Sequence, residues 1–406
     1  MKTDDSSRLQ NLNKTIKAAS QTNLYKDKNL KILSRLEDLS TLPFTTKQDL
    51  RENYPFGGLA TDMQNVIEVH TSSGTTGKAV VSYLTKKDIL EGNKAISKAW
   101  KTFGINKDSR LMFIMSYGLF SGAAINTYAI QHLGAFVLPA GIQPIMKQIN
   151  LMIDYQIDTI VATPGFLLYL SDSLEKNNIP REKLNLKRAI AAGEIYSNQT
   201  RAKIEELLDI EVFDHYGLCE VNTGIAYECE YHNGLHILDD YVIAEIINPK
   251  TGGTLKLGEL GELVLTSLKK EASPIIRYRT GDITKIIPGK CKCGRQSYRI
   301  DRIHGRINDT MFIRGIKVNP YELRDFILNI VGNNLKSSDI IFKIKKNDIK
   351  YTPQVYISVK DDKILPKLQK DIKDTTKVPF NINSVEPNFF GREDNNKVKL
   401  VQYVED

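Results

Sequence analysis

Residues 109–177 alternate between short apolar runs and longer amphipathic stretches, and this alternation leaves few fold classes open to the chain. The runs that predict buried strands are 109–116, 135–140 and 158–164. The stretches that predict helices are 123–134, 144–156 and 165–177. Strands that are followed in turn by helices are typical of a parallel sheet covered by helices, so we expect an α/β fold here.

The segments on either side have other patterns. Residues 8–40 look helical, because Leu and Ile recur at helical intervals near their start. Thr46 and Asp49, three residues apart, form a capping-box signature for a helix within 44–53. After about residue 210, glycine, proline and β-branched residues become frequent, which predicts antiparallel hairpins with a turn at 248–253.

The pattern changes once more near residue 305. A predicted helix at 321–331 is followed by alternating strands at 336–346 and 351–360, then by a Lys-rich helix and a last strand. A unit of about 100 residues is long enough to fold as a domain. We therefore predict a boundary near 304–309, with a large domain over 1–304 and a small α+β domain over 305–406.

Composition narrows the functional classes. The chain has 406 residues and a net charge of +8, but Lys and Arg are spread along it among Asp and Glu. Dispersed charge favours a solvated surface over a nucleic-acid interface. No apolar run approaches ~18 residues, and the polar start lacks the apolar core of a secretory signal. We expect a cytoplasmic protein that binds neither nucleic acid nor membrane.

The segment 71–80 is a polar, glycine-containing loop that interrupts an otherwise apolar stretch of the chain. Nine of its ten residues are small, polar, glycine or lysine, and strand-like residues precede it. Glycines let successive backbone N–H groups aim at one anion, and Lys78 adds positive charge. Two residues separate Gly74 from Gly77, which is shorter than the Walker A spacing. A flexible linker is the alternative, but the lysine and the flanking strands favour a phosphate-binding loop.

The segment TSSGTTGK at 71–78 resembles the phosphate loop of adenylate-forming ligases, which include acyl-CoA synthetases, adenylation domains and luciferases. The rest of the chain resembles the phenylacetate–CoA ligase family of that superfamily, and the similarity covers nearly its whole length. The segments that carry this resemblance, in family order, are 36–57, 116–123, HYGLCE (215–220), SPIIRYRTGDIT (273–284), CKCGR (291–295), 301–320 and GREDNNKVK (391–399).

The resemblance implies a fold and a reaction. The fold is a large N-terminal domain of layered sheets and helices, with a small mobile C-terminal lid. The reaction joins a carboxylate, aryl or arylacetic, to the α-phosphate of ATP, releasing pyrophosphate, and a thiol then displaces AMP. The thiol is that of coenzyme A; the phosphopantetheine arm of a carrier protein is the alternative. A non-catalytic nucleotide-binding protein is a third hypothesis, and a homodimer is common among relatives.

The same resemblance assigns site residues. Tyr216 matches the ring that packs on adenine, and Gly193-Glu194 the segment lining the adenine face. Asp282 matches the aspartate that binds the ribose hydroxyls, and Arg306 the arginine beside ribose and phosphate. The residues expected to cradle the phosphates are Ser72, Ser73, Gly74, Thr75, Thr76 and Gly77, followed by Lys78.

Two charged residues are expected to serve the adenylation step. Glu220 matches a magnesium-associated glutamate, in keeping with the hard oxygen ligands that Mg²⁺ prefers. Lys397 is the expected catalytic lysine, with Lys399 as the neighbouring candidate. The alternatives without a catalytic role are a turn aspartate at 282, a surface acid at 220 and a solvated lysine at 397.

The chain also departs from the family pattern. Cys219 stands where Ser or Thr is usual, Ala79 replaces a proline, and Asn308 replaces a hinge aspartate. Cys219 and Asn308 are expected to affect the rate of the reaction and the alternation of the small domain between its two positions.

The cysteines suggest a second site. All four lie between Cys219 and Cys293, a clustering that in a cytosolic protein favours metal or catalysis over disulfides. By resemblance, a structural zinc ion would be held by Cys229, His236, Cys291 and Cys293. His232 is the rival of His236, and four reduced thiols without metal are the alternative.

Overall fold

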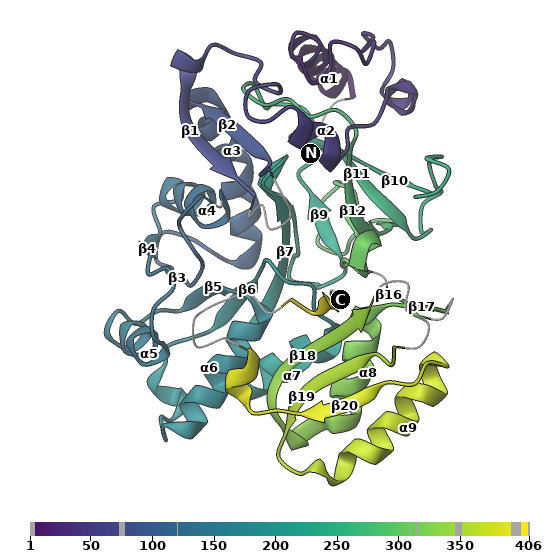
Figure 1. Ribbon diagram of the computed structural model, residues 1–406. Coiled ribbons are helices and arrows are strands. Elements are labelled where there is room, and N and C mark those ends of the chain that lie inside the picture. The colour runs from purple at the N-terminus through teal and green to yellow at the C-terminus, as the bar shows by residue number, and fades with distance from the viewer. Residues whose placement is uncertain are drawn as a thin grey trace.

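The computed structural model describes residues 5–72, 78–119, 121–309, 311–313, 316–345, 351–390 and 399–404 (Figure 1). Short 3-10 turns link many of its elements. They are Leu36–Thr41, Met63–Asn65, Lys101–Phe103, Arg181–Lys183, Ile307–Asp309, Gly332–Asn334, Asp362–Ile364 and Pro387–Phe390. None of the helices described is both long enough and apolar enough to cross a lipid bilayer.

The N-terminal segment is less helical than the sequence predicts. Helix α1 covers Asp5–Ala19 only, so the prediction of a helical 8–40 is wrong beyond residue 19. The Thr22 amide and hydroxyl both donate to the Ala19 carbonyl and turn the chain there. The prediction at 44–53 is confirmed: α2 covers Lys47–Glu52, and Thr46 and Asp49 form the capping box.

A nine-stranded sheet forms the centre of the molecule, in the order β13-β14-β9-β8-β7-β6-β5-β3-β4. Strands β3 to β7 pair in parallel, which confirms the predicted parallel sheet. These strands are β3 (Arg110–Phe113), β4 (Phe136–Leu138), β5 (Thr159–Ala162), β6 (Arg188–Ala191) and β7 (Glu211–Leu218). The antiparallel remainder consists of β8 (Asn222–Tyr227), β9 (Leu235–Ile237), β13 (Ile286–Ile287) and β14 (Arg299–Ile300).

Helices cover both faces of the parallel part (Figure 1). Neighbouring residues of a strand point to opposite faces, and in β5 Ile160 enters one apolar core whereas Val161 enters the other. The first core is closed by α5 (Ile145–Asp154), α6 (Pro164–Lys176) and α7 (Asn198–Leu208). The second core is closed by α3 (Lys86–Trp100) and α4 (Ser121–His132).

Two smaller sheets complete the N-terminal part. The predicted hairpins form an antiparallel sheet of β10 (Val242–Ile247), β11 (Gly261–Ser267), β12 (Tyr278–Thr284) and β15 (Gly305–Arg306). The predicted turn follows β10, where Asn248 and Gly253 are hydrogen bonded. Strands β1 (Val66–Thr71) and β2 (Val81–Thr85) form an antiparallel pair on either side of the polar loop.

Residues after 310 build a separate apolar core around a mixed sheet of order β20-β19-β18-β21. The elements are β16 (Met311–Ile313), β17 (Ile316–Val318), α8 (Pro320–Val331), β18 (Leu335–Lys345), β19 (Gln354–Val359), α9 (Leu365–Thr376), β20 (Asn381–Ser384) and β21 (Val401–Val404). Because β15 still pairs with β12, residues 305 and 306 are bonded to the N-terminal part. The boundary at 304/305 therefore stays a prediction.

Candidate active site

A cavity of about 790 Å³ lies where the ends of β6 and β7 meet β12, β15 and the C-terminal sheet. We call it the large cavity. Segments far apart in the sequence supply its walls. Seven of the residues expected at the site line it: Ser72, Gly193, Glu194, Tyr216, Glu220, Asp282 and Arg306. The fold thus brings together most of the described residues that the sequence assigned to one site.

Asp282 is the buried carboxylate of this cavity, with 1% of its surface exposed. The Tyr216 hydroxyl donates to Asp282 Oδ2 at 2.7 Å, and Arg306 Nε donates to Oδ1 at 2.7 Å. The pairing of β12 with β15 sets Asp282 opposite Arg306. Burial and the nearby Asp282 charge raise the pKa of Tyr216, and the same carboxylate raises the pKa of Arg306. The tyrosine therefore stays a neutral donor and the arginine a cation.

Glu220 follows β7 and is also buried, with its carboxylate held from two sides. The Tyr278 hydroxyl donates to Glu220 Oε1 at 3.1 Å, and Lys47 Nζ lies 3.8 Å from the same oxygen. Lys47 is a residue that the sequence did not single out, although it lies in the family-like segment 36–57. A buried carboxylate with one cation beside it and an open cavity in front is suited to share a second cation.

The loop between β1 and β2 is closed at its base. The Ser72 amide donates to the Val80 carbonyl at 2.9 Å, and the Val80 amide donates to Ser72 Oγ at 3.0 Å. Lys78 is exposed and is not among the residues that line the large cavity. The expected phosphate ligands Ser73, Gly74, Thr75, Thr76 and Gly77 lie outside the described residues, so their role stays a prediction.

Gly193 has a backbone conformation that favours glycine. Its φ is +80°, a left-handed conformation that side chains disfavour. The next residue, Glu194, accepts a hydrogen bond from the Gly165 amide at the start of α6, at 3.2 Å. The Gly193-Glu194 turn is thereby fixed against α6 at the edge of the cavity, and its expected role beside adenine stays a prediction.

The lysine expected to catalyse adenylation is not placed. Lys397 lies outside the described residues, whereas its rival Lys399 is exposed and lines the large cavity. At the predicted hinge, Asp309 also lines the cavity, and its carboxylate accepts a hydrogen bond from the Tyr321 hydroxyl at 2.5 Å.

Four thiol and imidazole side chains meet away from the cavity, and we call them the thiol cluster: Cys229, His236, Cys291 and Cys293. Their ligand atoms all lie within 4.8 Å of one another. Cys229 Sγ is 3.7 Å from Cys291 Sγ, and Cys293 Sγ is 3.3 Å from His236 Nε2. A tetrahedral zinc ion with bonds of about 2.3 Å to sulfur separates two sulfurs by about 3.8 Å, so the geometry fits. Ser297 Oγ lies 3.0 Å from His236 Nδ1 and orients the ring.

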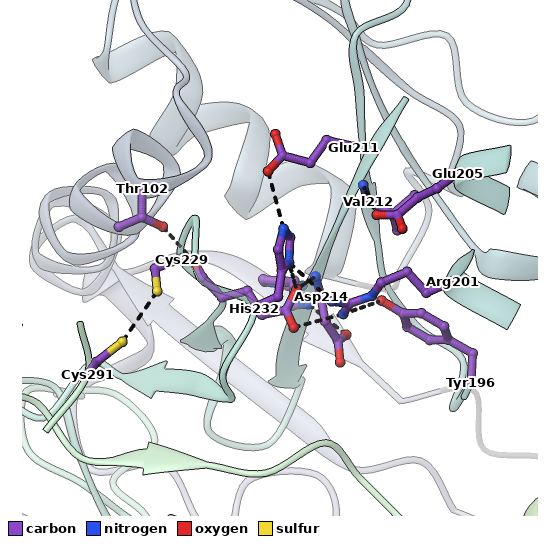
Figure 2. Close-up of polar contacts among 12 residues, drawn as sticks. Thr102, Tyr196, Arg201, Glu205, Glu211, Val212, Asp214, Cys229, His232 and Cys291 are labelled. Atoms are coloured by element: carbon purple, nitrogen blue, oxygen red, sulfur yellow. Dashed lines mark hydrogen bonds and ion pairs between the residues drawn. The ribbon is translucent and has the colours of Figure 1, made fainter. Parts of the chain in front are cut away.

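His232 belongs to a different group, as Figure 2 shows. Its Nδ1 lies 3.1 Å from Glu228 Oε2 and its Nε2 lies 3.2 Å from Glu211 Oε1. Arg201 also pairs with Glu228, at 2.8 Å. The hydrogen bond with Glu228 raises the pKa of His232. Of the two histidines considered, His236 is the one that lies with the cysteines.

Asp214 is a cavity residue that the sequence analysis missed. Its amide donates to Glu228 Oε2 at 2.7 Å (Figure 2). Asp214 is also one of the residues that line the large cavity. Burial and the neighbouring Glu228 raise the pKa of Asp214. It precedes Tyr216 by two positions in β7, and this period of two is the signal that would have found it.

Comparison with known proteins is consistent with this geometry. The model of the AMP-binding enzyme family matches residues 6–268. The chain is 40% identical over 300 residues to a phenylacetate–coenzyme A ligase of Pseudomonas putida, covering 73% of this chain and 68% of the relative. It is 34% identical over 368 residues to that of Aromatoleum evansii, covering 87% and 82%.

Solved structures give the same fold. A 2-hydroxyisobutyryl-CoA ligase in the postadenylation state has a TM-score of 0.89 at 20% identity, covering 98% of this chain and 89% of the other. The same ligase in the thioesterfication state has a TM-score of 0.71, covering 98% and 90%. Both matches show that this chain has the fold of these ligases.

Proposed function

This chain belongs to the AMP-binding enzyme family, and its similarity to phenylacetate–coenzyme A ligases identifies it as an AMP-forming acid–CoA ligase. We propose that it activates an aryl or arylacetic acid. The observation that carries the proposal is the large cavity, in which Tyr216, Asp282, Arg306 and Glu220 converge. The similarity to phenylacetate–coenzyme A ligases over most of the chain supports the same class of acid.

Apolar side chains in the lining of the large cavity support an aromatic substrate. Trp100, Phe113 and Met115 are among the lining residues, and the Trp100 and Phe113 rings lie 6.1 Å apart between centroids. The Trp100 indole N–H donates to Asn126 Oδ1 at 3.0 Å, so the polar group of this side chain is already bonded. Apolar and aromatic lining residues suit a planar ring whose carboxylate points toward the polar residues of the cavity.

In the first half-reaction, a carboxylate oxygen of the acid bonds to the α-phosphorus of ATP, and the bond to pyrophosphate breaks. We assign Asp282 to the ribose hydroxyls, Tyr216 and Gly193-Glu194 to the adenine, and Arg306 to the ribose and α-phosphate. The loop from Ser72 to Lys78 holds the outer phosphates. Mg²⁺ bound beside Glu220 would offset charge on the phosphates, and Lys397 would bring a cation to the two reacting anions.

In the second half-reaction, the thiol sulfur bonds to the acyl carbon, AMP leaves with the electron pair, and the thiol proton is released. The relatives favour coenzyme A as the thiol. A carrier protein has no support among them, and it remains an outcome that the assay below separates.

The test is pyrophosphate release with a panel of aryl, arylacetic and aliphatic acids, with and without CoA. We expect release with aryl or arylacetic acids and formation of the CoA thioester. Release from aliphatic acids alone would contradict the proposed class of acid. Release without CoA turnover, followed by transfer to a holo-carrier protein, would contradict CoA as the acceptor.

The family resemblance also supports predictions about the C-terminal residues and the thiol cluster. We propose that residues 305–406 form a lid that moves between the two half-reactions, and that the thiol cluster holds a structural zinc ion linking the loops of Cys229 and Cys291. We also propose a cytoplasmic location, and a homodimer because dimers are common in the family that the chain resembles.

A further inference from the structure

Lys270 is a buried lysine that lies directly behind the large cavity. Only 4% of its surface is exposed. Its Nζ donates to Ser82 Oγ at 2.7 Å and to the Glu220 main-chain carbonyl at 3.0 Å. Both acceptors are uncharged, and burial lowers the pKa of Lys270. Because removing an ammonium group from water costs free energy, a lysine in this position needs a reason beyond packing.

The segment around Lys270 is held in place by Asp88 at the start of α3. The Glu271 amide donates to Asp88 Oδ1 at 2.6 Å, and the Ala272 amide donates to Oδ2 at 3.1 Å. The same carboxylate caps α3 by accepting from the Thr85 amide. The backbone next to Lys270 is therefore bonded to the start of α3, which restricts the position of the Lys270 ammonium group.

The two acceptors of Lys270 belong to different parts of the proposed site. Ser82 lies in β2, immediately after the loop whose base is closed by Ser72 and Val80. Glu220 carries the carboxylate that Tyr278 and Lys47 hold. One ammonium group thus ties the strand that leaves the phosphate loop to the main chain of the acidic residue.

Lys270 is not among the described residues that line the large cavity, and it lies beside a second, small cavity of about 20 Å³. Lys270, Ser82 and Cys219 line it, and Cys219 also lines the large cavity. The lysine therefore does not touch the space in which a substrate would bind, and any effect on the reaction must pass through Glu220 or the loop.

We infer that Lys270 is a positioning residue for the magnesium–triphosphate part of the site. It fixes the main chain of Glu220 relative to the phosphate loop, while Tyr278 and Lys47 set the direction of the Glu220 carboxylate. This inference rests on the proposed role of Glu220. Residues that orient a metal ligand through a hydrogen bond commonly change metal affinity by about 10- to 100-fold when they are replaced.

The test compares Lys270→Met with Lys269→Met by calorimetry of Mg–ATP and, without magnesium, of AMP. Lys269 is the adjacent lysine, but it pairs with Glu91 and Asp240 instead. We expect Lys270→Met to bind Mg–ATP about 10- to 100-fold more weakly and to need more Mg²⁺ for half-saturation. Its affinity for AMP should stay within about twofold, since AMP does not use the metal site. Lys269→Met should change neither affinity.

A second variant covers the case in which Lys270→Met fails to fold. Ser82→Ala keeps the lysine and its bond to Glu220 but removes the loop-side acceptor, so it should weaken Mg–ATP binding in the same direction by a smaller factor. Wild-type affinity for Mg–ATP in both folded variants, or an equal loss of Mg–ATP and AMP binding, would overturn the inference. Neither measurement needs an acid, so failure to find an aryl substrate would overturn the proposed function alone.

Discussion

Arg306 Nε lies 2.7 Å from Asp282 Oδ1, so a residue beyond the predicted domain boundary holds the carboxylate that we assign to the ribose of ATP. The two residues face each other across the β12–β15 pairing. A movement of the C-terminal residues that opened this pairing would change the environment of Asp282 directly. The nucleotide site and the arrangement of the two parts of the chain are therefore linked through one ion pair.

Replacing Asp282 by Asn should weaken the binding of both ATP and AMP by at least about tenfold. The amide loses the charge that pairs with Arg306 and presents only one oxygen to the ribose hydroxyls. Calorimetry of AMP binding measures the effect. Glu245→Gln is the matched control, because it removes a carboxylate from a buried ion pair with Arg277 outside the large cavity. Equal affinities for the wild type and Asp282→Asn would contradict the assignment.

Replacing Tyr278 by Phe should raise the Mg²⁺ concentration for half-maximal pyrophosphate release by a few-fold. The hydroxyl that holds Glu220 Oε1 is lost, but the carboxylate and Lys47 remain. Glu220→Gln should have a much larger effect on the same curve. Tyr25→Phe removes a buried hydroxyl bonded to Thr45 and should lower stability without moving the magnesium curve. An unchanged curve for Glu220→Gln would rule out its magnesium role.

Alanine substitutions should separate the two lysine candidates. Lys397→Ala is expected to abolish acyl-adenylate formation while sparing thioester formation from supplied acyl-adenylate, because only the first half-reaction brings two anions together. Lys399→Ala should affect the first half-reaction less. The opposite ranking would move the assignment to Lys399, and equal loss of both half-reactions in Lys397→Ala would remove it.

Protein purified without chelator should contain about one equivalent of zinc, and Cys291→Ser should lower both metal content and the melting temperature. The loss follows from the removal of one of two sulfurs that lie 3.7 Å apart. Cys219→Ser is the control, since that thiol is buried outside the thiol cluster. Less than about half an equivalent in the wild type would count against the site.

Stability should fall as the pH is lowered from 6.5 to 4, in part because of His215. Burial lowers its pKa to about 4 from an ordinary value of 6.5. The unfolded chain binds a proton in this window and the folded chain does not, so the folded state loses up to about 1.4 kcal/mol per pH unit. The free energy of unfolding, measured by urea unfolding at several pH values, should change less steeply with pH in His215→Asn than in the wild type. His132→Asn controls for the loss of an exposed imidazole. Parallel slopes for the wild type and His215→Asn would refute the prediction.

Local sequence signals predicted much of the fold, since they depend on neighbouring residues. The capping box of Thr46 and Asp49 and the alternation along 109–177 both form as expected. The helix expected through residue 40 ends at Ala19. The helical spacing of apolar residues stops near Ile16, and without it the chain turns.

The contacts of the site were harder to predict, because they join distant segments. Motifs located Glu220 and Asp282, but not the partners that orient them. Lys47 reaches Glu220 from α2, and Lys270 reaches it from the segment after β11. No period or spacing in the sequence relates these positions, and the fold brings them together from α2 and from the segment between β11 and β12.

The number of hydrogen bonds that the Asp282 carboxylate can accept predicts which sugar the nucleotide site prefers. A carboxylate offers about four acceptor positions. Among the described residues, Tyr216 and Arg306 take one each. The remainder matches the two hydroxyls of a ribose, so the internal donors orient the carboxylate without exhausting it. A 2′-deoxynucleotide would leave one buried position unfilled, and the enzyme should therefore distinguish ribonucleotides from deoxyribonucleotides at this single residue.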